Sequence, residues 1–292
     1  MTKPKKMKTE THKDTSIFVA QREKIVRELS IKERNDLTDK QKEIIGAAMD
    51  KASKCILING CPGAAKSYTS ILSALKLLNS KKVSQIVYIR SLVQAKDGET
   101  GFLAGSLEEK TFYFNQPLYQ ALEEILPKED IDYLIKDGRI ITYPTSMLRS
   151  YNFHNSAIIV EEAQNMTFDS IYTASTRAGM YSRLFVIGDS KMQNDLGKLS
   201  GFSKFVSIFS DEEARNAGFR YFHLDSNEIV RSPFVKFVVQ KIEKYNAEQE
   251  TAEKVEKDKH KSHTNGNTRN GNHLVLPEAS LRHEEWSPVL KN

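Results

Sequence analysis

Cysteine is scarce in this sequence, and long hydrophobic runs are absent from it. Only Cys55 and Cys61 occur among the 292 residues, which give neither a disulfide framework nor a zinc pattern. No apolar run approaches the roughly 20 residues that span a bilayer, and the basic N-terminus lacks the hydrophobic segment of a secretory signal. No Ser-His-Asp arrangement and no cluster of His and Cys metal ligands is present. We therefore expect a cytoplasmic protein that has no membrane contact.

The composition is that of a globular protein with a core. Hydrophobic residues make up 39% of the chain and charged residues 28%, which is ordinary for a soluble domain. The formal net charge of +5 suits an acidic partner such as a nucleic acid but does not require one. Composition alone therefore leaves the function open.

The chain divides into three regions by its pattern. Between about residues 37 and 245, short β-branched runs alternate with amphipathic stretches, which predicts an α/β fold with a parallel sheet flanked by helices. Strands are expected at 55–59, 85–90, 139–143, 157–160, 184–188 and 220–224, and helices at 67–78, 117–125, 168–176 and 233–245. Residues 1–36 are expected to form a basic extension. Residues 246–292 are expected to be a disordered polar tail, because they hold too little apolar surface to offset ordering.

The clearest motif follows the first expected strand and opens a helix. It is a glycine-rich loop that ends in lysine and serine, a P-loop, whose backbone N–H groups surround phosphates at a helix start. Its residues are Gly60, Cys61, Pro62, Gly63, Ala64, Ala65, Lys66 and Ser67. Lys66 is expected at the β- and γ-phosphates of ATP and Ser67 at Mg²⁺. Ala65 stands where the pattern has glycine, and its methyl group is expected to crowd or reshape the loop.

Two further strand ends carry polar groups in the order that a P-loop enzyme needs. The run 157–160 ends in Glu161 and Glu162, which predicts one carboxylate for Mg²⁺ and the next for the attacking water. Glu161 stands where aspartate is usual. The strand 184–188 ends in Asp189, a nucleotide-binding candidate, and Gln193 follows as a residue that orients the attacking water,.

With these elements in place, the sequence resembles the PhoH-like ATPases, which are related to superfamily 1 helicase cores. The resemblance runs from about residue 37 to 245. It rests on six ordered segments besides the P-loop, at 37–41, 101–110, 161–167, 176–179, 188–196 and 229–233. The segment 147–150 is similar to a further family piece, in which Arg149 is a candidate contact for nucleic acid or nucleotide. The closest similarity in character is to phage-encoded members, which implies a host-cell cytoplasm.

The resemblance implies a single RecA-like domain that binds ATP and Mg²⁺ and acts with RNA or single-stranded DNA. It also implies that Gln41 reads the adenine base. Helicase cores place ATP between two such domains, the second of which supplies an arginine worth about 10³–10⁵ in rate. Because this chain has room for one domain, we expect a head-to-tail ring, a homohexamer, with Arg231 or Arg177 completing a neighbour's site. The alternative for each arginine is a salt bridge or phosphate contact within its own subunit.

Three functions remain open on the sequence. The first is an ATP-driven nucleic-acid motor or remodeller, which the motif order favours. The second is an ATP-regulated RNA-processing nuclease factor, for which no separate carboxylate cluster is seen. The third is a nucleotide switch or adapter that does not hydrolyse ATP, in which Ala65 and Glu161 have weakened turnover. A small-molecule kinase shares the P-loop, but the segments at 37–41 and 229–233 argue against it.

Overall fold

The computed structural model describes residues 25, 27–91, 107–191 and 195–265. The strands are β1 (Cys55–Gly60), β2 (Gln85–Arg90), β3 (Ile140–Pro144), β4 (Ser156–Glu161), β5 (Arg183–Gly188) and β6 (Phe219–Leu224). The α-helices are α1 (Asp39–Met49), α2 (Lys66–Asn79), α3 (Leu107–Ile125), α4 (Lys128–Lys136), α5 (Phe168–Ser175), α6 (Phe202–Ile208), α7 (Glu212–Ala217) and α8 (Pro233–Asn265). Short 3-10 helices are η1 (Thr145–Ser150), η2 (Ala163–Asn165), η3 (Gly197–Leu199) and η4 (Ser226–Glu228).

The six strands form one parallel sheet in the order β3-β2-β4-β5-β1-β6. Each expected strand is confirmed to within one residue at either end. The P-loop strand β1 and the acid-bearing strand β4 are not neighbours, because β5 lies between them. This is a single RecA-like α/β P-loop domain, as the sequence predicted. All six strands point the same way, so their carboxyl ends gather the site residues at one edge of the sheet.

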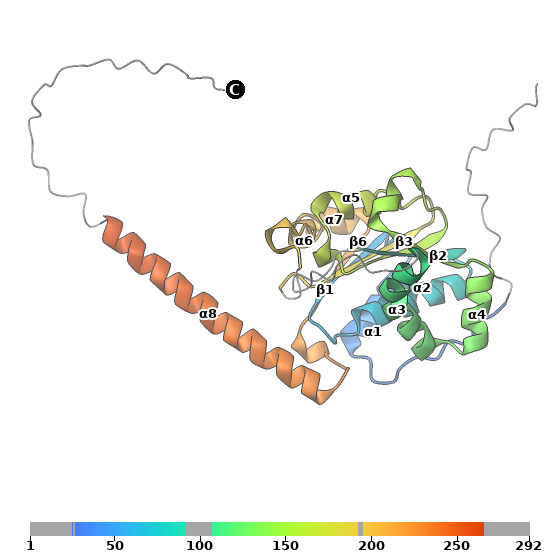
Figure 1. Cartoon of the computed structure of the whole chain (residues 1–292), viewed down its shortest axis with the longest axis horizontal. Helices are drawn as coiled ribbons and strands as arrows, with labels where there is room; N and C mark the ends of the chain where they lie inside the picture. The colour runs from blue at the N-terminus through green and yellow to red at the C-terminus, as the bar shows by residue number, and fades with distance from the viewer. Residues whose placement is uncertain (1–24, 26, 92–106, 192–194, 266–292) are drawn as a thin grey trace, which may run out of the picture. The chain divides into compact units, whose positions relative to one another are not determined.

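Helices cover both faces of the sheet (Figure 1). On one face α1, α2, α3 and α4 pack against a core that includes Ile56, Ile58 and Tyr88. On the other face η1, α5 and α6 pack against a core that includes Leu57 and Val186. Strands buried on both faces read as continuous apolar runs rather than as alternation, which is why Ile56, Leu57 and Ile58 are all fully buried.

The helices differ from expectation mainly in length. Helix α3 begins ten residues before the expected 117, with Pro117 inside it. The helices α1, α4, α6 and α7 were not among those expected. Helix α8 begins at Pro233 as expected but continues to Asn265, so the expectation of disorder is wrong for residues 246–265. Low hydrophobicity argues against a packed core, but Glu and Lys, the commonest residues of this segment, are strong helix formers. The rest of the expected tail, 266–292, lies outside the described residues.

The packed region also begins earlier than expected. Ile25 and Leu29 were assigned to the extension, yet both are buried. The Leu29 backbone N–H donates to Asn79 Oδ1 at 2.8 Å, and Arg27 pairs with the buried Asp130 at 2.6 Å. The boundary expected at residue 36 is therefore wrong, because isolated apolar residues before it fill gaps beside α2 and α4. Residues 1–24 lie outside the described part of the chain.

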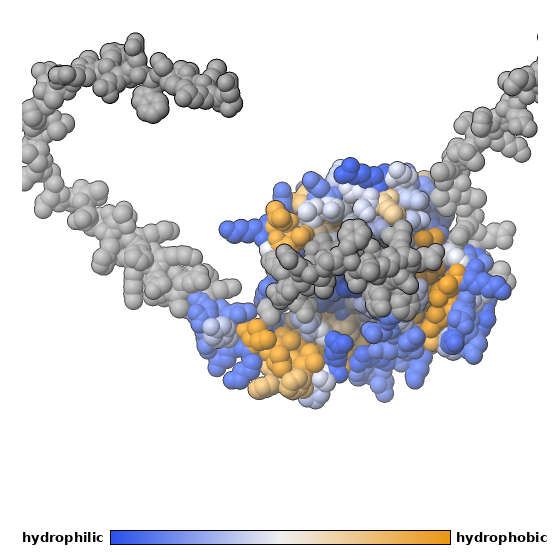
Figure 2. Space-filling model, in the orientation of Figure 1, coloured by the Kyte–Doolittle hydropathy of each residue, from blue (hydrophilic) through white to orange (hydrophobic). Residues whose placement is uncertain are grey.

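The contacts divide the chain into two units, residues 1–240 and 241–292. In the first unit, hydrophobic side chains gather at the first turns of α8 (Figure 2), where Phe234 and Phe237 are exposed. The second unit is, in its described part, the remainder of α8, in which Lys244 and Glu248 pair one turn apart at 4.0 Å,. None of the helices in the described ranges is both long and apolar enough to cross a bilayer.

Candidate nucleotide-binding site

The P-loop connects β1 to α2 and is held in shape by tight backbone approaches. A Cβ placed on Gly60 would lie 2.7 Å from Cβ of Leu224 on β6, so only glycine fits there. The Cys61 N–H donates to the Leu224 carbonyl at 3.1 Å, which extends the β1–β6 ladder into the loop. Gly63 has φ of 81°, a left-handed conformation that glycine adopts at no steric cost. The loop therefore turns where the sequence motif places its glycines.

Ala65 adopts the left-handed conformation that its position demands. It is the N-cap of α2 with φ 54° and ψ 29°. A non-glycine residue pays about 1–2 kcal/mol in this region, because Cβ crowds the backbone. The loop thus keeps the turn that glycine would make and carries strain at the residue before Lys66.

Lys66 and the start of α2 face the space that phosphates would fill. Lys66 Nζ donates to the carbonyls of Gly60 and Cys61 at 2.7 and 2.9 Å. The first N–H groups of a helix have no intrahelical partner, and with the helix dipole they attract anions. Phosphate oxygens can replace these two carbonyls as hydrogen-bond acceptors for Lys66.

Ser67 and Glu161 bring the P-loop and the end of β4 into direct contact. The Ser67 hydroxyl donates to Glu161 Oε1 at 2.7 Å. Burial raises the pKa of Glu161 to about 7, against the opposing effect of the Ser67 hydrogen bond. Its second oxygen, Oε2, is buried and has no hydrogen-bond partner in the described chain. A hydroxyl beside an unsatisfied carboxylate fits Mg²⁺, which prefers oxygen ligands and takes few of them from protein.

Glu162 turns away from the strand toward the cleft. Its φ of 55° is left-handed, which ends β4 and aims its side chain differently from that of Glu161. The Gln164 amide donates to Glu162 Oε2, while Gln164 Oε1 accepts the Asp189 N–H at 3.1 Å. Sequence reasoning did not select Gln164 as a site residue. Its position two residues after Glu162, inside the segment 161–167 that carries the family resemblance, was the available signal.

Asp189 and Gln193 are the two remaining candidates from the segment after β5. Asp189 is buried at the end of β5, and its Oδ1 accepts the backbone N–H of Lys191 at 2.9 Å. The residue before it, Gly188, lines the nucleotide cleft, but Asp189 does not. The expected role of Gln193 in orienting water concerns a position outside the described residues.

Gln41 is in contact with the P-loop but not with the cleft. It is fully buried, and its Nε2 donates to the carbonyls of Ala64 and Glu228 at 3.1 and 2.8 Å. Its Oε1 accepts the Thr38 N–H at 3.0 Å in a capping box. Both amide hydrogens are used, so the side chain cannot read adenine in this conformation. The same Thr-x-x-Gln pattern thus caps α1 and braces the loop, while the expected contact with adenine stays a prediction.

The two candidate arginines lie at opposite ends of the strands. Arg231 lines the cleft of its own chain and lies close to Gly63. The Arg177 carbonyl accepts the N–H of Phe153 at 2.8 Å, just before β4 begins, whereas Glu161 lies where β4 ends. The Arg177 guanidinium donates to the Arg149 carbonyl at 3.0 Å. Arg177 therefore supports η1 within its own subunit.

The cleft has a volume of about 380 Å³, within the range of small-molecule sites. Away from the P-loop it is lined by residues that the sequence did not single out, namely Arg34, Pro117, Gln120, Ala121 and Glu124. Arg34 also stacks over the ring of Tyr68 at 5.5 Å. These residues come from the N-terminal segment and α3, so only the fold brings them beside the phosphate loop.

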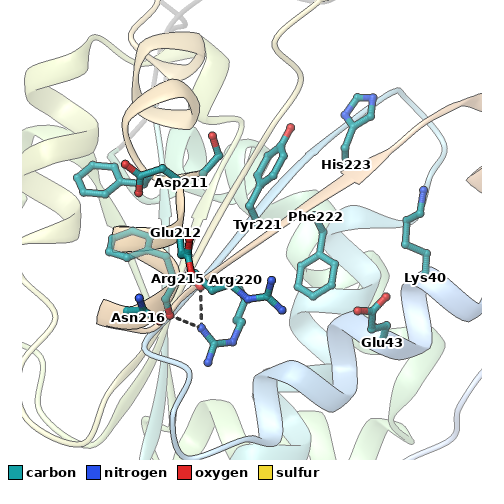
Figure 3. A pocket seen from close by; sticks show the side chains of 13 residues that line it. Lys40, Glu43, Asp211, Glu212, Arg215, Asn216, Arg220, Tyr221, Phe222 and His223 are labelled. Carbon is teal, nitrogen blue, oxygen red and sulfur yellow. Dashed lines mark hydrogen bonds between the residues drawn. The ribbon is translucent and has the colours of Figure 1, made fainter.

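A larger hollow of about 740 Å³ lies along the open edge of β6, beside α7 and α1 (Figure 3). Arg220 turns back to the Arg215 carbonyl at 2.7 Å, and Asp211 caps α7. Its charged groups are of both signs, and in the described chain no three His, Cys, Asp or Glu side chains are grouped as for a metal. We assign the chemistry to the smaller cleft, because the phosphate loop and the paired acids are there.

Comparison with known proteins agrees with this geometry. The model of the PhoH-like protein family matches residues 31–243. The chain is 32% identical over 187 residues to a PhoH-like protein of Synechocystis sp., covering 63% of this chain and 55% of that protein. It is 29% identical over 207 residues to a PhoH-like protein of Bacillus subtilis, covering 70% and 63%. It is 30% identical over 167 residues to Protein PhoH of Escherichia coli, covering 56% and 47%. The matches thus span about half to two thirds of these relatives.

Proposed function

The chain belongs to the PhoH-like family of P-loop NTPases, and we propose that it hydrolyses ATP in a reaction coupled to RNA or single-stranded DNA. The observation that carries the ATPase part is the 2.7 Å contact between Ser67 and Glu161. It joins the phosphate loop to the end of β4, so the two halves of the motif meet although 94 residues separate them in sequence.

The residues have separate tasks in this reaction. Lys66 and the first turn of α2 hold the β- and γ-phosphates. Glu162 accepts a proton from water as the water oxygen attacks the γ-phosphorus, and the bond to the β–γ bridging oxygen breaks to release ADP. Gln164 orients the Glu162 carboxylate. Ser67 and Glu161 would hold Mg²⁺, which neutralises phosphate charge when it is bound.

Coupling to a nucleic acid is supported by charge and by family character. The net charge of +5 favours a polyanion. We also propose that copies assemble head to tail as a homohexameric ring, since the described residues hold one RecA-like domain where helicase cores use two. Arg231 lies in the cleft of its own chain, and we place its action there. Mixing Arg231→Ala with Lys66→Ala subunits then restores no activity, whereas recovery would show that Arg231 acts on a neighbour.

A nucleotide switch is the second candidate, and two observations favour it. Ala65 is strained beside the catalytic lysine, and the raised pKa of Glu161 leaves that carboxyl partly protonated near pH 7. Both features would slow turnover while leaving nucleotide binding intact. No carboxylate cluster among the described residues favours the nuclease alternative.

The test is phosphate release from ATP and Mg²⁺, with and without single-stranded RNA or DNA. Lys66→Ala is the control for phosphate binding and Glu162→Gln the control for chemistry. Stimulation by the polymer that both variants abolish is the result expected of the coupled ATPase. Tight ATP binding with no turnover under any polymer would replace it with the switch.

A further inference from the structure

A group of exposed aromatic and sulfur-containing side chains lies on the segments 147–155 and 172–181, which precede β4 and β5. We call it the aromatic shelf. It comprises Met147, Arg149, Tyr151, Tyr172, Met180 and Tyr181. Tyr181 is 69% exposed, Met180 64% and Tyr172 58%. Groups of large exposed apolar side chains are typical of interaction sites.

The shelf is built on a rigid backbone. Its two segments, 147–155 and 172–181, are joined by a parallel bridge between Phe153 and Ala178. The Gly179 N–H donates to the Phe153 carbonyl at 2.8 Å and the Asn155 N–H to the Met180 carbonyl at 2.9 Å. A Cβ on Gly179 would lie 2.6 Å from the His154 ring, so the segments are in close contact. The exposed rings are therefore held in place before any partner arrives.

The backbone of Tyr181 has a strained conformation. Its φ of 62° is left-handed, which is unusual for a bulky side chain. Such strain gathers at functional sites, where it holds a group in a working position. Here it holds a ring that is 69% exposed to water.

The shelf carries positive charge and no negative charge of its own. No aspartate or glutamate occurs between Asp137 and Glu161, or between Asp169 and Asp189. The Arg149 side chain is exposed, and none of the hydrogen bonds or ion pairs between described residues uses its guanidinium. Arg177 donates to the Arg149 carbonyl at 3.0 Å, which fixes the backbone that carries this free cation.

We propose that the aromatic shelf binds single-stranded nucleic acid, with bases stacked on Tyr172 and Tyr181 and a phosphate at Arg149. Aromatic faces stack with any base, and arginine supplies the contact to the backbone. The exposed cation Arg149, with Asp169 as the one acid within a helical turn of Tyr172, favours a polyanion. This inference rests on the proposed coupling to RNA or single-stranded DNA and gives that polymer a place on the chain.

The shelf is separate from the nucleotide cleft. Strand β4 begins beside the shelf at Ser156 and ends in the cleft at Glu161. At about 3.3 Å per residue, the two ends are roughly 17 Å apart. Variants of the shelf can therefore weaken polymer binding without touching the residues that hold phosphate.

The experiment measures binding of fluorescein-labelled oligo-U and oligo-dT of about 20 nucleotides to the full chain by anisotropy. Tyr172→Ala and Tyr181→Asn remove one ring each, and asparagine tolerates the left-handed backbone. Each is expected to weaken binding roughly 5- to 100-fold. Tyr172→Phe keeps the stacking face and should bind as the wild type does, as should Tyr245→Ala, which removes a tyrosine that is 60% exposed on α8.

A salt titration adds a readout that a folding defect would not mimic. Arg149→Gln should reduce the slope of log affinity against log salt by about 0.7, the value for one phosphate contact on a single strand. If the wild type binds the oligonucleotides and the shelf variants bind equally well, the shelf assignment is overturned and the proposed function stands. If the wild type binds neither polymer, the shelf assignment and the proposed coupling to a nucleic acid are both wrong. If the variants change the sedimenting mass and leave binding unchanged, the shelf is an interface between copies and the inference is wrong.

Discussion

The replacement Gln41→Ala distinguishes two roles for this residue, one that stabilises the phosphate loop and one that recognises the adenine base. The Gln41 side chain forms three hydrogen bonds, to the carbonyls of Ala64 and Glu228 and from the N–H of Thr38. All three partners are backbone groups, and the side chain itself is fully buried. Alanine leaves those groups without this partner and water cannot easily replace it.

The expected loss follows from these bonds. A buried polar group left unsatisfied costs about 1–3 kcal/mol, so three such bonds at the low end amount to about 3 kcal/mol. For a domain of this size that lowers Tm by roughly 6–12 °C. Because Gln41 holds the Ala64 carbonyl, the phosphate loop also loosens. The KM for ATP and for GTP should rise by the same factor, since the base is not involved.

The assay is thermal unfolding of the nucleotide-free protein, followed by hydrolysis of ATP and GTP. Gln240→Ala is the matched control, because Gln240 is an exposed glutamine on a helix and should change neither quantity. A variant that melts within about 1 °C of wild type and loses ATP but not GTP would refute the brace. That result would return Gln41 to the role of reading adenine.

Three further predictions concern the loop and the acids. Glu162→Gln should lower kcat by about 10²–10⁴ and leave ATP binding unchanged in a fluorescent-nucleotide titration; an unchanged kcat would identify another base. Ala65→Gly should raise the free energy of unfolding in urea by up to about 1 kcal/mol, since relief of the left-handed alanine exceeds the entropy that glycine adds to the unfolded chain; a loss of stability would contradict the strain. Burial raises the pKa of Glu161 from 4.5 to about 7, so the folded state keeps a proton that the unfolded state has released. The free energy of unfolding should therefore fall by up to about 3 kcal/mol as pH rises from about 4.5 to 7, and Glu161→Gln should remove that slope. An unchanged slope in the variant would assign it to another group.

The strands and the phosphate site were predictable because their signals are local. An apolar run such as Ile56, Leu57 and Ile58 predicts a doubly buried strand wherever it occurs. The loop from Gly60 to Ser67 is contiguous, so its conformation follows from its own residues and from the helix they begin. The continuation of helix α8 after Tyr245 was missed, because the polar composition that argues against a core says nothing against a helix.

The roles of side chains whose partners are distant in sequence could not be predicted from the sequence pattern. The Thr-x-x-Gln pattern at 38–41 is compatible with both a base reader and a helix cap, and only the fold shows that Gln41 also bonds the Ala64 and Glu228 carbonyls. Arg34 and Glu124 are far apart in sequence, and the packing of the N-terminal segment on α3 brings both to the cleft.

The sequence by itself determined which strands form and which loop holds phosphate, because hydrophobic period and backbone conformation are set within a few residues. It also determined the order of lysine, serine and the two acids along the chain. Only the tertiary structure decided that Ser67 meets Glu161, that Arg231 lines the nucleotide cleft, and that the segments carrying Tyr151 and Tyr181 lie side by side. Those outcomes depend on strand order and on how helices pack over the sheet, which are properties of the whole fold rather than of any one segment.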